Sequence, residues 1–396
     1  MLLRNWIPAL VLVFIFGAIT RQPWPVAFSV AAGMVFTVMV LWRRRALERI
    51  AYQRRWTYRR GFPGEQLSVR IIAENRKLLP ISWLRVIDLW PVAVGPQDET
   101  VLGPSHLPDS GELVNLYSLR WFHQIERSYQ LLLRKRGVYQ VGPVDLYSGD
   151  LFGMYVTEHK LEQFDRVTVF PELLALPALQ LNTQDPFGDR RSTLRLFDDP
   201  TQPMAVREYR PDDSFRTIHW PATARTGALQ VRVFQPVSAK VMMVCLNATT
   251  QPQFWLGVDS ARLEYLIKVA ATVIYQASQG GYSVGLLSNG TMAHSDQPFF
   301  IPPSRSPDHL ATLLTALAAV TPFSTAPFPN YLAASVSRVP FGASLVVITA
   351  IVDSELNASL LQLKRYRSNT TLLAVTPQPA APIPGIRAIH IEMPQP

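Results

Sequence analysis

Two long apolar runs lie near the start of the chain, with a short polar break between them. Residues 6–20 (WIPALVLVFIFGAIT) and residues 25–42 contain no charged side chain. A helix needs roughly 20 apolar residues to cross the hydrocarbon core of a bilayer. The second run nearly reaches this length and the first is shorter, so residues 1–42 are predicted to form a hairpin of two transmembrane helices. A cleaved signal peptide is the alternative for the first run, although no small-residue cleavage site follows it.

An arginine-rich segment, residues 43–60, follows the second apolar run. It contains eight arginines and one acid, Glu48, a balance of 8 − 1 = +7, whereas the whole 396-residue chain has 38 − 29 = +9. Basic residues collect on the cytoplasmic side of membrane helices. The segment therefore predicts a protein of the inner (plasma) membrane with both termini in the cytoplasm. A nucleic-acid site is the alternative, but the position beside an apolar run favours the lipid bilayer as the partner and no nucleic acid.

Residues 61–170 follow a period of two rather than 3.6. The stretches QLSVRIIAEN, ISWLRVIDLW and RVTVF are rich in β-branched and aromatic residues, and Gly and Pro turns bound them. Several short strands of this kind are typical of an antiparallel sandwich, so we predict an all-β, immunoglobulin-like domain. His106 and His123 each stand alone in this region, so neither is expected to bind a metal.

Residues 241–396 alternate between strand and helix patterns. The run VMMVCL, at residues 241–246, is apolar throughout, as a strand buried on both faces would be. Asp259 then precedes a helical pattern that ends at a Gly pair. Further strands are predicted in YSVGLLS, SLVVITA and TTLLAVT, with helices opening at Ser306-Pro307, near Tyr331 and near Ser354. This alternation predicts a Rossmann-like α/β domain with a parallel sheet covered on both sides.

The usual motifs of enzymes and cofactor-binding proteins are missing from the sequence. No strand is followed by a Gly-rich phosphate loop, and there is no G-x-S-x-G nucleophile motif. Cys245 is the only cysteine, which excludes an internal disulfide and a cysteine-only zinc site. We therefore predict a protein that is not an enzyme and that binds no cofactor.

A dense mixture of charged and aromatic residues fills residues 205–236 (AVREYRPDDSFRTIHWPATARTGALQVRVFQP), inside a predicted linker of residues 171–240. Arginine and carboxylate side chains at this density suit bidentate hydrogen bonds, and arginine planes stack on aromatic rings. The segment is predicted to be a structural clamp between two domains, or alternatively a docking surface for a partner.

This segment resembles the hallmark V-R-E-Y-x-P-G-D-x-x-R-x-I-D-W-x-x-x-A-R-x-G-x-L of the bacterial domain-of-unknown-function 58 (DUF 58) proteins. The residues that carry the likeness are Arg207, Glu208, Tyr209, Pro211, Asp213, Arg216, Trp220, Ala224, Arg225 and Gly227. The resemblance implies a membrane hairpin, a β-sandwich and a von Willebrand factor type A-like α/β domain. It also implies a cytoplasmic protein partner, for which a MoxR-type AAA+ ATPase is the candidate.

The chain departs from the family pattern in ways that bear on metal binding. Asp212 and His219 stand where the hallmark has Gly and Asp. Type A domains that hold a metal have a D-x-S-x-S run after the first strand, and here Asn247 and Thr249 occupy the corresponding positions. Hard divalent cations favour carboxylate oxygens, so we predict a degenerate, metal-free site.

Two functions are compared on these grounds. The first is a non-enzymatic integral membrane scaffold or adaptor whose cytoplasmic part docks a protein. The alternative is a metal-dependent ligand-binding or adhesion protein that uses the type A-like domain. A hydrolase would need a nucleophile, a base and oxyanion donors in one pocket, and the sequence indicates no such set.

Overall fold

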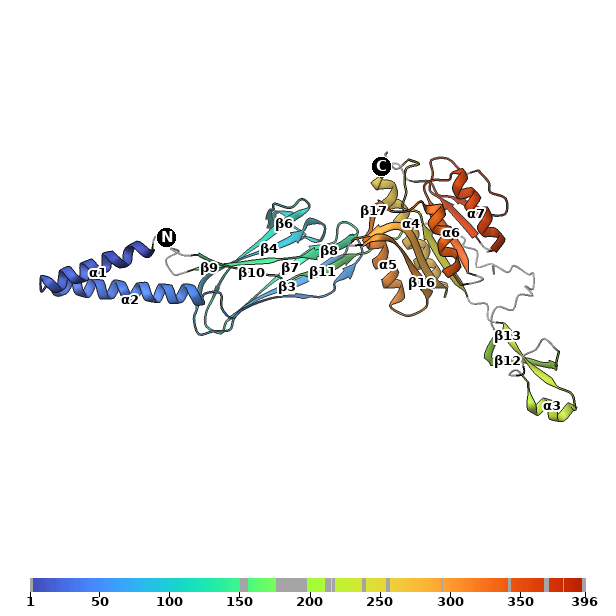
Figure 1. The fold of residues 1–396 in the computed structure, drawn as a ribbon, viewed down its shortest axis with the longest axis horizontal. Helices are drawn as coiled ribbons and strands as arrows, with labels where there is room; N and C mark the ends of the chain where they lie inside the picture. Colours follow the sequence, from blue (N-terminus) through green and yellow to red (C-terminus); the bar gives the residue numbers. More distant parts are fainter. Residues whose placement is uncertain are drawn as a thin grey trace. The chain divides into compact units, whose positions relative to one another are not determined.

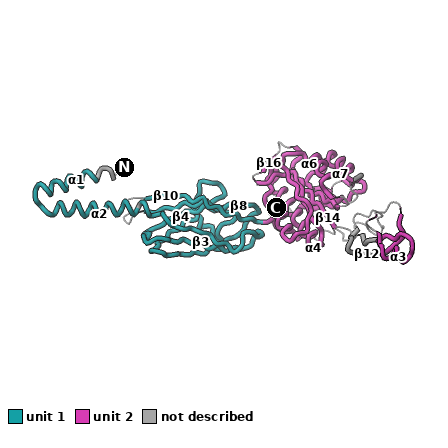
Figure 2. The backbone as a smooth tube through the Cα atoms, turned by 60° about the horizontal axis from the view of Figure 1, so that its bottom comes forward, with its two compact units in different colours: residues 1–169 teal, residues 170–396 magenta. Residues whose placement is uncertain are grey.

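The computed structural model describes residues 3–149, 156–175, 198–210, 215, 218–236, 240–253, 257–293, 295–340, 343–366, 370–379 and 381–393. The chain divides into two compact units, Met1–Val169 and Phe170–Pro396, coloured separately in Figure 2.

Two apolar helices open the first unit, α1 (Leu3–Ile19) and α2 (Pro23–Arg45). Gly17 allows them to approach closely at the turn, because a Cβ there would lie 2.9 Å from the Cβ of Pro25. Of the described helices, α2 is the one that is long and apolar enough to cross a membrane, over Pro23–Trp42. The apolar part of α1 is shorter, at Ile7–Ile19, so the structure supports the second of the two predicted spans by length and composition.

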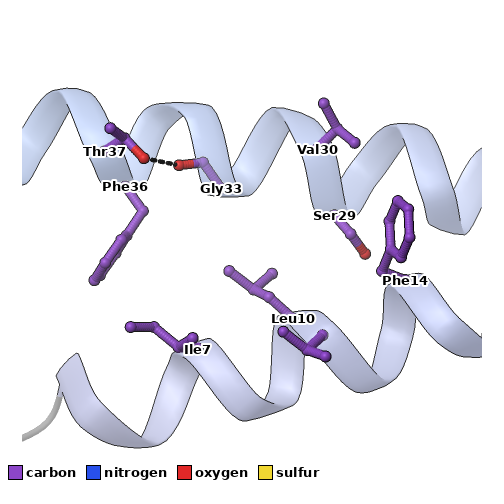
Figure 3. A pocket seen from close by; sticks show the side chains of 9 residues that line it. Ile7, Leu10, Phe14, Ser29, Val30, Gly33, Phe36 and Thr37 are labelled. Carbon is purple, nitrogen blue, oxygen red and sulfur yellow. Dashed lines mark hydrogen bonds between the residues drawn. The ribbon is translucent and has the colours of Figure 1, made fainter.

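A cavity of about 430 Å³ lies between α1 and α2 (Figure 3). Its two polar side chains are already engaged within α2, since the hydroxyl of Ser29 donates to Pro25 O and that of Thr37 donates to Gly33 O, each at 2.8 Å. The rest of the lining is apolar, from Ile7, Leu10, Val11, Phe14, Val30, Gly33 and Phe36. Such a lining suits hydrocarbon and offers no polar group to orient a ligand.

Among the described residues, eleven strands and two 3-10 helices follow in this unit; several of the strands are labelled in Figure 1. Their bounds are β1 Ile50–Trp56, β2 Arg60–Gly61, β3 Gln66–Asn75, β4 Ile81–Pro91, η1 Val92–Val94, η2 Glu99–Val101, β5 Leu102–Pro104, β6 Ser110–Leu119, β7 Gln124–Leu132, β8 Gly137–Val141, β9 Val144–Gly149, β10 Val156–Leu161 and β11 Asp165–Val169. They form three sheets in the orders β1-β3-β7, β10-β9-β4-β6-β5 and β2-β11-β8. Apolar residues from all three sheets share one core, so the predicted all-β region is present.

Strand β1 lies inside the segment 43–60 that the arginine count assigned to the membrane interface. Its Arg54 points into the core rather than toward solvent or lipid. Arg54 forms a bidentate pair with Asp88 of β4, at 2.7 and 2.8 Å, and a third bond of 2.8 Å to Asp165 of β11. Burial alone would lower the pKa of Arg54, but its hydrogen bonds to Asp88 and the charge of that residue raise it above the ordinary value. At least one side chain of the arginine-rich segment is therefore part of the fold.

The second unit contains a seven-stranded sheet in the order β16-β15-β14-β18-β19-β20, with β17 paired to β15. The bounds are β14 Val241–Leu246, α4 Ser260–Gln279, β15 Ser283–Met292, β16 Ser295–Ser304, α5 His309–Ala319, β17 Val320–Ser324, α6 Phe328–Ser335, η5 Val336–Arg338, β18 Ser344–Thr349, α7 Ser354–Tyr366, β19 Thr370–Ala374 and β20 Arg387–His390. Helices lie on both sides of the sheet (Figure 1), as the alternation of patterns predicted.

The sheet differs from the prediction at one of its edges. Strand β16 pairs antiparallel with β15, so the sheet is mixed rather than all parallel. Its sequence, SDQPFFIPPS, contains three prolines, which remove ladder donors and hide the strand pattern. Helix α5 spans His309–Ala319, close to the predicted helix of residues 309–320.

The predicted linker, residues 171–240, contains a hairpin of its own. Strands β12 (Asp198–Glu208) and β13 (Gln230–Pro236) pair antiparallel, and a short helix, α3 (Trp220–Thr226), lies between them in sequence. The register opposes Glu208 to Gln230 and Arg207 to Val231. We call these two strands, α3 and the described residues between them the hallmark hairpin.

Candidate functional site

Three parallel strands, β14, β15 and β18, end at the same edge of the sheet, where open α/β sheets bind ligands. Asn247, which follows β14, donates from Nδ2 to the hydroxyl of Thr349 and accepts from Thr249 N–H, both at 3.0 Å. Asn289, near the end of β15, accepts from Ala248 N–H at 2.8 Å. Its Nδ2 donates to the hydroxyl of Thr249 at 3.0 Å and to Ala326 O at 3.1 Å. The amide and hydroxyl side chains at this edge are thus hydrogen-bonded to one another and to the backbone.

No charged ligand set accompanies this network among the residues that the structure describes. The two nearby acids each cap a helix, with Asp259 accepting from Arg262 N–H and Asp353 accepting from Leu356 N–H. Over the described ranges, no group of three or more His, Cys, Asp or Glu could hold a metal ion. Burial raises the pKa of the Cys245 thiol in β14, which disfavours the nucleophilic thiolate. The chemistry of this edge is that of a neutral, closed hydrogen-bond network.

The sequence pattern predicts Asn247 and Thr249 at this edge but not Asn289. This residue is fully buried, and it connects β14 to β15 through both ends of its amide. The available signal was a lone Asn after the apolar run VGLLS, since an amide side chain at a buried position must find hydrogen-bond partners.

Residues of the motif begin and end the short helix of the hallmark hairpin. His219, where the family pattern has Asp, accepts from Ala222 N–H through Nδ1 at 3.0 Å and so caps α3. Asp is among the preferred N-cap residues, so His219 performs the same structural task. Gly227 ends α3 with a φ of 72°, a left-handed conformation that favours glycine. Two positions of the motif are therefore explained by local structure.

Large apolar side chains of the hallmark hairpin are exposed to solvent. Phe215 is 71% exposed and stacks on Tyr209, with ring centroids 5.6 Å apart. Trp220 is 66% exposed at the start of α3. Backbone bonds bring these residues around the start of β13, because Tyr209 N–H donates to Leu229 O and His219 N–H donates to Gln230 O. Leu229 is itself exposed.

The structure describes some of the other hallmark residues and not others. Pro211, Asp213 and Arg216, together with Asp212, lie outside the described residues. Arg207 is partly exposed and donates from Nη1 to the carbonyl of Glu208 at 3.0 Å. Glu208, Ala224 and Arg225 are exposed.

A family model described as "Protein of unknown function DUF58" matches residues 205–392. The DUF58 match begins in the hallmark hairpin and runs through the α/β sheet to β20, so the predicted resemblance is confirmed over this range. A curated relative, the "Uncharacterized protein YeaD" of Bacillus subtilis (strain 168), is 21% identical over 229 residues. The alignment covers 57% of this chain and 52% of the relative, so the chain spans about half the length of the relative that it matches.

Solved structures resemble parts of the chain only weakly. The sporulation control protein Spo0M of Bacillus subtilis aligns with 31% of this chain and 50% of its own, at 13% identity and a TM-score of 0.19. A PapD-like domain of human CEP192 aligns with 31% of this chain and 84% of its own, at 17% identity and a TM-score of 0.17.

Proposed function

We propose that the protein is a non-enzymatic, membrane-anchored scaffold whose cytoplasmic part docks a protein partner through the hallmark hairpin. The observation that carries this proposal is the exposure of Phe215 and Trp220 around the start of β13. Aromatic side chains dominate the energetics of protein interfaces, and a small element that leaves two of them in solvent suits a docking role.

The membrane part of the proposal rests on α2 and the arginines that follow it. Trp42 and the exposed Arg44 and Arg45 stand at the end of the helix that is long enough to span a bilayer. By the positive-inside rule this end lies in the cytoplasm, and an α1–α2 hairpin places both termini there. We further propose that the β-rich region is an immunoglobulin-like sandwich and the α/β region a von Willebrand type A-like, Rossmann-like domain.

The partner is proposed from the resemblance to DUF 58 proteins, which implies a MoxR-type AAA+ ATPase. The neutral network at the sheet edge supports docking without a metal, because Asn247 bonds to Thr349 of β18 and Asn289 bonds to the residues that follow β14. Near this edge the two acids among the described residues, Asp259 and Asp353, each use a carboxylate oxygen to accept a helix N–H, so helix capping competes with any divalent cation. The hallmark hairpin, rather than the sheet edge, is therefore the surface that we assign to the partner.

A binding measurement on the full chain tests the proposal. The chain is placed in lipid nanodiscs and titrated with a purified MoxR-type AAA+ ATPase from the same organism. The double variant Phe215→Ser/Trp220→Ser is expected to bind at least about tenfold more weakly, since truncation of an aromatic interface anchor costs 2 kcal/mol or more.

The matched control is Phe323→Ser in β17, because Phe323 is 70% exposed but lies outside the hallmark hairpin. This variant is expected to bind like the wild-type chain. A wild-type chain that does not bind, or an equal loss in both variants, contradicts the proposal.

A further inference from the structure

Two turns of the β-rich region form one connected tip. Residues 76–80 join β3 to β4, and residues 120–123 join β6 to β7. The buried Asn75 binds both turns, because its Nδ2 donates to Leu79 O and to Arg120 O, each at 2.9 Å. Phe122 N–H also donates to Lys77 O at 3.3 Å. The two turns are thus held together, and we call residues 76–80 and 120–123 the tip.

The tip is fastened to the chain that leaves α2. Lys77 Nζ donates to Ala46 O and, at 2.7 Å, to Glu48 O. Arg76 N–H donates to Arg49 O at 3.0 Å. The apolar span of α2 ends at Trp42, so these contacts hold the tip only a few residues beyond the end of that span.

The tip presents large apolar side chains where turns usually carry small polar residues. Leu78 is 75% exposed, Trp121 64% and Phe122 66%. Phe122 has a φ of 48°, which is uncommon for a residue with a side chain. Tryptophan and phenylalanine beside basic residues are typical of segments that enter the boundary between headgroups and acyl chains.

The surroundings of the tip are basic. The exposed cationic side chains are Arg44, Arg45, Arg49, Arg76 and Arg120. Two acids lie among them, Glu48 and Glu74, so these five arginines leave a formal balance of 5 − 2 = +3. Glu74 accepts from Arg76 at 2.7 Å, which leaves Arg120 and the arginines at and just after the end of α2 to face an anionic surface.

We infer that the tip binds the same bilayer that α2 spans, with Leu78, Trp121 and Phe122 at the headgroup boundary and the arginines on anionic lipid phosphates. The inference rests on the proposed membrane anchoring, and it extends that anchoring to a second, interfacial contact. The partner is a lipid surface because the tip is continuous with the end of α2 and has the charge that anionic leaflets attract. The consequence is that the β-rich region is held against the membrane in one orientation.

Depth-dependent quenching on the full chain tests this contact. A cysteine is introduced at the tip (Phe122→Cys) and labelled with an environment-sensitive fluorophore; the native Cys245 is buried and stays unlabelled. The control is Leu107→Cys, an exposed apolar site before β6, whereas the tip follows the end of that strand. A ten-residue strand separates the two sites by about 30 Å.

The chain is reconstituted in nanodiscs of phosphatidylcholine and phosphatidylglycerol, with spin-labelled lipid or aqueous iodide as the quencher. The probe at residue 122 is expected to be quenched at least twofold more by lipid than the probe at residue 107, and to be protected from iodide. The variant Arg49→Gln/Arg120→Gln is expected to lose the dependence of this quenching on phosphatidylglycerol.

Equal iodide access at both sites overturns the inference. So does a probe at residue 122 that is protected only after a partner protein is added, because the tip would then be a protein surface. Extraction of the membranes at alkaline pH separates this failure from that of the proposed anchoring. A chain that is released has no membrane anchor, whereas a chain that is retained with an exposed tip contradicts the tip contact alone.

Discussion

The β-rich region and the α/β region each bury a polar centre, charged in the first and neutral in the second. In the β-rich region, Arg54 is bonded to Asp88 and Asp165, and Tyr52 donates its hydroxyl to Asp88 at 2.7 Å. Arg54, Asp88 and Asp165 come from β1, β4 and β11, which belong to three different sheets. The charged centre therefore ties all three sheets of this region together.

In the α/β region the polar centre contains no charge. Asn247, Asn289 and Thr349 are 5% exposed or less, and each is hydrogen-bonded to another strand or to the loop after a strand. The Thr349 hydroxyl donates to Ile351 O and accepts from Ile351 N–H, which closes the end of β18. This network joins three neighbouring strands at the edge where a ligand would bind.

The difference lies in what remains when one partner is removed. A buried charge that loses its counter-charge is strongly unfavourable, because the surrounding protein cannot solvate it. A neutral donor or acceptor that loses its partner costs only its own desolvation, which is smaller. The charged centre should therefore be the more sensitive of the two, and the neutral one should be inert toward cations.

The largest effect is expected for Asp88→Ala. Asp165 would be the one carboxylate left bonded to Arg54, whose cation would remain buried, so the β-rich strands should lose about 3–5 kcal/mol of stability. The free energy of opening is measured strand by strand from amide hydrogen exchange on the full chain in detergent. The amides of β14, β15 and β18 should not change.

The control for this variant is Glu126→Gln, which removes an exposed ion pair with Arg70 (3.3 Å) in the same region. Exposed pairs contribute about 0–1 kcal/mol, so its exchange should stay close to that of the wild-type chain. If Asp88→Ala has no more effect than this control, the charged centre does not hold the sheets together and the comparison fails.

A smaller effect is expected for Asn289→Ala. The N–H of Ala248, a buried residue, would lose its acceptor, and the hydroxyl of Thr249 would lose a donor. Loss of one buried partner costs about 1–3 kcal/mol, so amides of β14 and β15 should exchange faster while the β-rich strands are unaffected. Asn330→Ala, an exposed position in α6, is the matched control and should change exchange little. A loss as large as that of Asp88→Ala would show that charge is not what separates the two centres.

Local patterns were sufficient to predict most strands and helices of the α/β region. The run VMMVCL forms β14 at residues 241–246, and α4 begins at Ser260 after the Asp259 cap, as predicted. Both depend on neighbouring residues alone, since an apolar run or a capping side chain acts within a few positions. Strand β16 was not predicted from the sequence. Its prolines interrupt the strand pattern, and its pairing depends on the neighbouring strand β15.

The polar centres were harder to predict because their partners are distant in sequence. Arg54 is one of eight arginines between residues 43 and 60, and its carboxylate partners lie 34 and 111 residues away. A charge count therefore assigned it to the membrane surface. The motif comparison was enough to recognise that Asn247 stands where a metal-binding type A domain has Asp. The pairing of β12 with β13 across residues 209–229 could not be recognised in this way.

The smallest effect is expected when Mg²⁺ or Ca²⁺ is added to the full chain. A divalent cation at the edge near Asn247 and Thr249 would have to displace bonds that the amides and hydroxyls already make, and it would gain no carboxylate there. A ligand at a concentration equal to its Kd stabilises the folded state by about 0.4 kcal/mol. Millimolar cations should therefore change the opening free energy of β14, β15 and β18 by less than this amount, and calorimetry should record no saturable heat. A saturable heat that Asn247→Ala abolishes would make the neutral centre a metal site, and it would favour metal-dependent ligand binding over docking through the hallmark hairpin.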